Sequence, residues 1–181
     1  MRIISGFHKG RKLKVPSDKY TRPTTDQMKE SLFNYLNNIL DFDQMKVLDI
    51  YAGSGALGLE SLSRGASEVH FVEMNFPVIK VLQENIELIR AEKQCRIFKM
   101  PALKFSALTE HDKYDLIFAD PPFFKDDIHE TAKNILKNGF LEDEGLFIIE
   151  RSIQTEEKDV EAFQSKPIKR MGDSLIYQLS L

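Results

Sequence analysis

The repeated alternation of short apolar strands with amphipathic helices, which begins at Lys46, constrains the fold more than any other feature. The apolar stretches expected to be strands cover residues 47–51, 69–73, 96–99, 115–119 and 146–150. Helical spacing of apolar residues separates them, over about 56–64, 76–91 and 127–138. Repeated strand–helix–strand units form a mostly parallel sheet with helices on both faces. We therefore predict an α/β fold.

The C-terminal region departs from this rhythm. Residues 169–171 and 174–179 are short strand-like stretches that flank the dipeptide Gly172-Asp173. A Gly-Asp pair between two apolar runs favours a tight turn between antiparallel strands. We predict that the sheet ends in an antiparallel hairpin.

The N-terminal region also has its own pattern. Residues 1–20 alternate short apolar and basic stretches around Gly6 and Gly10, which predicts a small β-hairpin. An isolated hairpin is not stable in water, so this one must rest on the main domain. We divide the chain into a hairpin extension over 1–22 and a main domain over 23–181.

The main domain is expected to begin with a helix. Thr24 and Gln27 resemble a capping box, and apolar residues follow helical spacing after them. We predict a helix over about 25–40.

Charge is unevenly distributed along the chain. Residues 1–40 contain eight Lys or Arg against three acids, a balance of +5, although the whole chain carries −3. A basic end is the natural place to meet a polyanion. The expected phosphate contacts are His8, Lys9, Arg11, Lys12 and Lys14. Basic residues on a small hairpin can also serve as no more than a solubilising surface.

Composition excludes several classes of protein. Cys95 is the single cysteine, which excludes an intrachain disulfide framework and a multi-cysteine zinc site. We expect no metal and a reducing, cytoplasmic setting. The apolar runs are far shorter than the roughly 18 residues of a membrane span, so we expect neither membrane insertion nor secretion. We expect a monomer.

A glycine-rich turn follows the first strand of the repeat. Ligands of open α/β sheets bind at the carboxyl ends of the strands, and glycines there let the backbone approach a ligand closely. Gly53, Gly55 and Gly58 spell G-x-G-x-x-G, and Glu73 stands where that motif has an acid for a ribose diol. By itself this pattern fits NAD. The alternative for Glu73 is a solvated carboxylate at a strand end.

Two features favour S-adenosylmethionine over NAD. Asp49 lies inside the strand before the turn, where it either braces the turn or contacts the ligand. A second motif at residues 120–123 also ends a strand, and it would have no role in hydride transfer to or from NAD. The cofactor contacts expected from the turn and its surroundings are Asp49, Ala52, Gly53, Ser54, Gly55 and Glu73.

The second motif is Asp120-Pro121-Pro122-Phe123. Two prolines fix the backbone and remove its N–H donors, which leaves the Asp120 carboxylate and the Pro121 carbonyl as outward acceptors. Two acceptors can bind both hydrogens of an exocyclic amino group, and Phe123 can stack on its ring. We predict that these four residues position an amino group for methylation. A rigid Pro-Pro turn with a packed phenylalanine is the alternative.

With these residues assembled, the chain resembles the bacterial 16S ribosomal RNA guanine-N2-methyltransferase family, the one named for guanine 966. The resemblance runs nearly end to end. It is carried by residues 2–6 with 9–11, 22–26 with 29–34, 49–66, and 120–123. The glycine turn alone indicates the superfamily, whereas the Arg-Pro-Thr segment combined with the Ala-Leu-Gly-Leu-Glu helix is much narrower.

The resemblance implies a Rossmann-like class I methyltransferase with a seven-stranded sheet. It implies S-adenosylmethionine as cofactor, 16S rRNA or the assembling small ribosomal subunit as partner, and 2-methylguanosine as product. Arg22 and Thr24 match the family's segment over the cofactor, although Arg22 could equally hold a phosphate. Many related enzymes bind the adenine amino group with Asp or Asn at the end of the third strand, where this chain reads Lys99-Met100-Pro101-Ala102-Leu103. We therefore expect backbone groups around Ala102 and apolar contacts to hold the adenine.

Other functions remain open. Related enzymes methylate adenine N6 in nucleic acids or a glutamine amide with similar Pro-Pro-aromatic motifs, but they usually present Asn where Asp120 stands. An NAD-linked oxidoreductase and a non-catalytic RNA-binding module are the alternatives from other classes.

Overall fold

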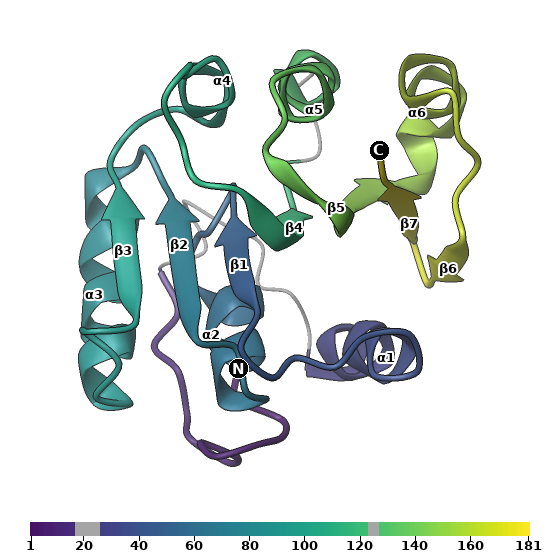
Figure 1. Ribbon diagram of the computed structural model, residues 1–181. Helices are drawn as coiled ribbons and strands as arrows, with labels where there is room; N and C mark the ends of the chain where they lie inside the picture. The colour runs from purple at the N-terminus through teal and green to yellow at the C-terminus, as the bar shows by residue number, and fades with distance from the viewer. Residues whose placement is uncertain (17–25, 123–126) are drawn as a thin grey trace.

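The computed structural model describes residues 1–16, 26–122 and 127–181, and in this part of the chain a seven-stranded sheet is covered by helices (Figure 1). The strands are β1 Lys46–Asp49, β2 Glu68–Val72, β3 Cys95–Phe98, β4 Tyr114–Ala119, β5 Leu141–Ser152, β6 Lys169–Met171 and β7 Ser174–Leu179. The helices are α1 Asp26–Leu36, α2 Ala56–Ser63, α3 Phe76–Leu88, α4 Ala102–Ser106, α5 Asp127–Lys137, the 3-10 turn η1 Ile153–Thr155, and α6 Glu156–Phe163.

The strand order across the sheet is β3-β2-β1-β4-β5-β7-β6. Strands β1 to β5 pair in parallel, and β7 pairs antiparallel with both β5 and β6. Gly172 adopts φ +61° in the turn between β6 and β7, which a glycine tolerates without strain. The predicted α/β fold with its closing antiparallel hairpin is therefore confirmed.

The core lies on both faces of the sheet. One apolar cluster joins α1, α2 and α3 to the sheet through residues such as Phe33, Leu59 and Leu82. The other cluster lies beneath α4 and α5, and includes Phe105 and Ile128. Figure 1 shows α4, α5 and α6 in a row along one side and α2 with α3 on the other. This burial on both faces explains why the central strands are almost continuously apolar.

Helix α1 ends earlier than predicted. The expected helix over about 25–40 stops at Leu36 and is followed by a turn. Asn37 and Asn38 are poor helix residues because their side chains compete for backbone groups, and the Asn38 amide donates to the Asn34 carbonyl. The helical spacing of apolar residues continues beyond Leu36, so it did not reveal where the helix ends.

Two helices and half of a strand were missed. Helix α4 has five residues, too few for a periodic pattern, and α6 is largely polar, with Asp159 as its buried residue. Strand β5 begins at Leu141, before the predicted apolar stretch. Its pairing with β4 shifts register between Leu141 and Leu146. Polar residues at the start of β5 hid its pairing with β4.

The N-terminal segment forms the predicted chain reversal, but with a single antiparallel bridge, Arg2 to Lys12, rather than paired strands. Ile3 and Leu13 are buried in the core cluster on the α1–α3 side. This segment, residues 1–16, therefore packs along α2 and is continuous with the core of the main domain, and we call it the N-terminal strap.

Candidate functional site

The candidate site lies where the strand order reverses, between β1 and β4. In such sheets this point opens a crevice at the carboxyl ends of the strands. Asp49 ends β1 and pairs in register with Phe118 of β4. Asp120 directly follows β4, and its charge contributes to the raised pKa of Asp49, so the two carboxyl groups lie near each other at this edge. The structure thus brings the two predicted motifs together.

The glycines of the turn serve three distinct purposes. Gly53 adopts φ +54°, and a Cβ added to it would project into open space. A Cβ on Gly55 would lie 2.5 Å from the Leu82 side chain, so this glycine allows close packing against α3. Gly58 packs on the ring of Phe71, where a Cβ would lie 2.3 Å from a ring carbon. Gly53 is therefore the glycine that leaves room for a ligand.

Asp49 braces this turn from below. Its carboxylate is 2% exposed, and Oδ2 accepts a hydrogen bond of 3.1 Å from the backbone N–H of Gly58 in the first turn of α2. Burial raises the pKa of Asp49 to about 7, and the negative charges of Asp120 and Glu73 add to this increase. The bracing role expected for Asp49 is thus present, and its contact with a cofactor stays a prediction.

Glu73 follows β2 and reaches across to the glycine turn. Oε2 accepts a hydrogen bond of 3.0 Å from the backbone N–H of Gly53, and Oε1 accepts from the N–H groups of Met74 and Asn75. The carboxylate therefore ties the ends of two neighbouring strands together. Since each carboxylate oxygen has two lone pairs, Oε2 retains one for another donor such as a ribose hydroxyl.

The acceptor motif continues β4 past the sheet edge. Asp120 is half-buried, Pro121 is buried and Pro122 is exposed. Beside this motif, the Tyr51 hydroxyl lies 3.3 Å from both an Asp127 carboxylate oxygen and the Thr131 hydroxyl of α5. These contacts connect the end of β1 to the start of the helix that follows the motif.

Three predicted site residues, Arg22, Thr24 and Phe123, lie outside the described residues. Ala52 and Ser54 are buried in the turn, and Ala102 is buried at the first position of α4, after Pro101. Among the described residues, no group of His, Cys, Asp and Glu is arranged to hold a metal ion. No helix in the described ranges is long and apolar enough to cross a bilayer.

Asn85 connects the N-terminal strap to the cofactor turn. Its side-chain amide donates to the carbonyls of Lys14 and Ser54, both at 2.9 Å, and its oxygen accepts from the N–H of Lys14. Asn85 is fully buried in α3, on the stripe that holds Leu82 and Ile86. Sequence reasoning missed this residue, although an asparagine within an apolar stripe was a usable signal.

Glu60 fixes the rest of the strap to α2. Its carboxylate accepts hydrogen bonds from the N–H groups of Ile4 and Ser5, and it pairs with Lys29 at 3.1 Å and Arg64 at 2.9 Å. Burial lowers the pKa of Lys29. Every charge in this cluster therefore has a partner, as buried charges require.

The basic residues of the strap lie on its solvent side. Lys9, Arg11, Lys12 and Lys14 are exposed, and His8 is half-buried. Lys14 forms an exposed ion pair of 2.8 Å with Glu84. Lys14 thus lies beside α3, whereas His8 lies at the end of α2.

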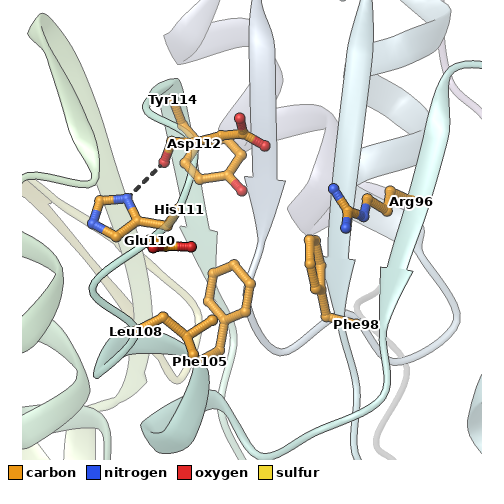
Figure 2. Close-up of a pocket in the computed structure, with 8 residues that line it drawn as sticks. All are labelled: Arg96, Phe98, Phe105, Leu108, Glu110, His111, Asp112 and Tyr114. Atoms are coloured by element: carbon orange, nitrogen blue, oxygen red, sulfur yellow. Dashed lines mark hydrogen bonds between the residues drawn. The ribbon is translucent and has the colours of Figure 1, made fainter.

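A separate hollow of about 310 Å³ lies beneath α4, away from the glycine turn (Figure 2). Arg96, Phe98, Phe105 and Tyr114 line it, together with residues of the loop before β4. The Cζ atom of the Arg96 guanidinium lies over the Phe98 ring, 4.7 Å from its centroid. None of the predicted site residues lines this hollow.

Known proteins resemble this chain over most of its length. The family model described as conserved hypothetical protein 95 matches residues 1–179. Ribosomal RNA small subunit methyltransferase D of Escherichia coli K12 is 36% identical over 179 residues, 99% of this chain and 88% of the relative. The solved structure of the Escherichia coli protein yhhF is 34% identical, covers 99% of this chain and 98% of its own, and has a TM-score of 0.80.

A more distant structure shares the fold alone. The 16S rRNA N2 G1207 methyltransferase of T. thermophilus, solved with AdoMet and guanosine, is 22% identical with a TM-score of 0.68, over 89% of this chain and 44% of its own. The glycine turn, the acidic strand ends and the Asp-Pro-Pro motif thus occur together in a chain that matches the family model almost end to end. This chain belongs to the conserved hypothetical protein 95 family, the family of ribosomal RNA small subunit methyltransferase D.

Proposed function

We propose that this chain transfers a methyl group from S-adenosylmethionine to the exocyclic N2 of a guanine in 16S rRNA. The observation that carries the proposal is the position of Asp120 and Pro121 directly after β4, at the strand-order reversal, where the charge of Asp120 acts on Asp49 of the neighbouring β1. The substrate named for the Escherichia coli relative supports rRNA of the small subunit. The guanosine in the T. thermophilus protein is a further precedent within this fold.

The residues present fit the cofactor. Gly53 faces open space that a Cβ would fill, and Glu73 holds its carboxylate 3.0 Å from the Gly53 nitrogen. A ribose diol and an amino acid portion can therefore lie along this turn, with Glu73 accepting from a hydroxyl. When bound, S-adenosylmethionine supplies a methyl group already activated on a sulfonium. The chain then needs chiefly to orient the acceptor.

Asp120 and Pro121 are proposed to orient the acceptor amino group. The Asp120 carboxylate and the Pro121 carbonyl accept the two N2 hydrogens of guanine, which aims the N2 lone pair at the methyl group. When N2 takes the methyl group, the carbon–sulfur bond breaks to leave S-adenosylhomocysteine, and the Asp120 carboxylate is placed to accept the N2 proton that is released. Since such positioning replaces a bimolecular encounter, it can account for most of the rate. The target base has to leave its stack to enter the crevice, and Phe123 is proposed to stack on it.

Transfer of labelled methyl to small-subunit RNA, taken from cells that lack the modification, tests the proposal. We expect the purified chain to label 16S rRNA or assembling subunits and to yield 2-methylguanosine on digestion. Asp120→Ala should lose transfer by about a hundredfold or more, as removal of a positioning group does, and should still bind S-adenosylhomocysteine.

Asp173→Ala, which changes an exposed carboxylate in the β6–β7 turn, is the matched control and should keep full activity. Equal labelling of DNA or protein would contradict the acceptor assignment. Full activity in Asp120→Ala would contradict the role of the motif, and absence of S-adenosylhomocysteine binding by the unaltered chain would contradict the cofactor.

A further inference from the structure

We propose that Phe7, at the tip of the N-terminal strap, is a stacking platform for an unpaired base of the RNA substrate, at a nucleotide other than the methylated guanine. This inference deepens the proposed function and rests on it. Phe7 is 87% exposed, more than any other large apolar side chain among the described residues. Single exposed apolar side chains are common on protein surfaces, so it is the fixed backbone and the charged surroundings of this ring that point to a partner.

The backbone holds Phe7 rigidly in this exposed position. The Phe7 N–H donates to the carbonyl of Ser63 at 2.7 Å, which satisfies one of the free carbonyls at the end of α2. The His8 N–H donates to the Ser63 hydroxyl at 2.9 Å, and that hydroxyl donates to the Ser5 carbonyl. Gly6 lies so close that a Cβ would overlap the Ser63 carbonyl oxygen. The backbone that presents the ring is therefore fixed before binding, which reduces the entropy lost on binding.

The charge around the ring selects a nucleic acid as its partner. Residues 1–16 contain no acid and five Lys or Arg. Lys9 and Arg11 flank Phe7 on the same turn and are exposed. An exposed aromatic ring among basic side chains is the arrangement with which proteins bind single-stranded nucleic acid, the ring stacking on a base and the cations contacting phosphates.

The position of Phe7 excludes the methylated guanine as the stacked base. Helix α2 starts at the glycine turn and returns the chain to the opposite edge of the sheet, from which β2 begins. Its eight residues span about 12 Å. Because the Phe7 backbone is attached at the Ser63 end, it lies at the far end of this helix from the glycine turn. The RNA must therefore extend along the flank of α2.

A tryptophan at position 7 provides a direct test, because the chain contains no other tryptophan. We expect the fluorescence of Phe7→Trp to be quenched by a mixed-sequence single-stranded RNA and much less by the same sequence as a duplex. Ile168→Trp, exposed near β6, is the matched control and should not respond. An unquenched Phe7→Trp, under conditions where the RNA binds, would overturn the inference.

Affinity and its salt dependence separate stacking from charge. Phe7→Ala should weaken binding of this RNA by about tenfold, Phe7→Leu nearly as much, and Phe7→Tyr should not. Phe7→Ala should leave the slope of log affinity against log salt unchanged, whereas Lys9→Ala should reduce it by about one phosphate contact. If Phe7→Ala lost binding to assembled subunits but kept its affinity for free RNA, Phe7 would contact a protein, and the stacking role would be refuted. Failure of methyl transfer by the unaltered chain would refute the proposed function without changing these binding readouts.

Discussion

Protonation of Asp49 is expected to control the stability of the ligand-free chain. Burial raises the pKa of this carboxyl from 3.8 to about 7. The folded chain therefore keeps a proton that the unfolded chain has released throughout this window. Because the folded state binds more protons, the free energy of unfolding contributed by Asp49 is highest below pH 4 and falls as the pH rises to about 7.

The magnitude follows from the size of the shift. Each pKa unit corresponds to about 1.4 kcal/mol, so the increase of about three units amounts to at most about 4 kcal/mol of lost stability at neutral pH. The hydrogen bond from Gly58 favours the ionised carboxylate and opposes the effect of burial, but burial is the larger influence. Asp49→Asn retains an oxygen that can accept from Gly58 and has no charge to bury.

Urea unfolding of both chains between pH 4.5 and 8 measures this effect. We expect the free energy of unfolding of Asp49→Asn, relative to the unaltered chain, to increase steadily up to about pH 7 and then level off. Other carboxyls titrate in both chains and cancel in this difference. A constant difference across the range would refute the conclusion that Asp49 is buried at a strongly raised pKa.

Two further predictions concern the turn and the strap. Gly53→Ala should cost about 1–2 kcal/mol of stability through its left-handed backbone and abolish most S-adenosylhomocysteine binding, because the added Cβ occupies the open space beside the turn. Gly58→Ala, which overpacks the Phe71 ring away from that space, should destabilise the fold by about 1–3 kcal/mol but leave the affinity of the folded chain for S-adenosylhomocysteine nearly unchanged. Calorimetry that finds the same loss of affinity in Gly53→Ala and Gly58→Ala would contradict the different roles of the two glycines. Glu60→Gln leaves Lys29 and Arg64 buried without their full countercharge and should lower the free energy of unfolding by about 3–5 kcal/mol. Glu84→Gln, which removes an exposed ion pair with Lys14, should lower it far less. Similar losses in the two variants would show that the Glu60 cluster does not anchor the strap.

The elements that sequence predicted correctly share a local signal. The apolar runs of β1, β2 and β4 are buried on both faces, and the Gly172-Asp173 turn has the composition that its geometry requires. Helix α6 escaped prediction because its contacts are polar: Asp159 accepts from Arg151 and the Thr155 hydroxyl inside the core. Spacing rules detect apolar stripes and do not register a buried ion pair.

The candidate site was predictable for a similar reason, and its supports were not. Asp49, Glu73 and Asp120 each follow or end a buried strand, so parallel pairing was enough to place them at one edge. A glutamate in a helix gives no local sign that it is buried, and Glu60 was not predicted to be. Its burial arises because the N-terminal strap covers it, and that contact joins residues more than fifty positions apart.

The strap and the crevice are parts of one packed unit. Lys14 and the Ser54 carbonyl share the buried Asn85 amide, and Ser54 belongs to the turn that is proposed to hold the cofactor. A displacement of the strap at Lys14 must therefore either break a buried hydrogen bond or move the turn, and leaving the Asn85 amide unpaired costs about 1–3 kcal/mol. Two further hydrogen bonds hold the glycine turn in place: Glu73 accepts from the Gly53 N–H, and Asp49 accepts from the Gly58 N–H. The RNA surface proposed along α2 is thus held by buried contacts in a fixed position relative to the proposed methyl-transfer site, and this fixed distance is what would let the chain select one guanine.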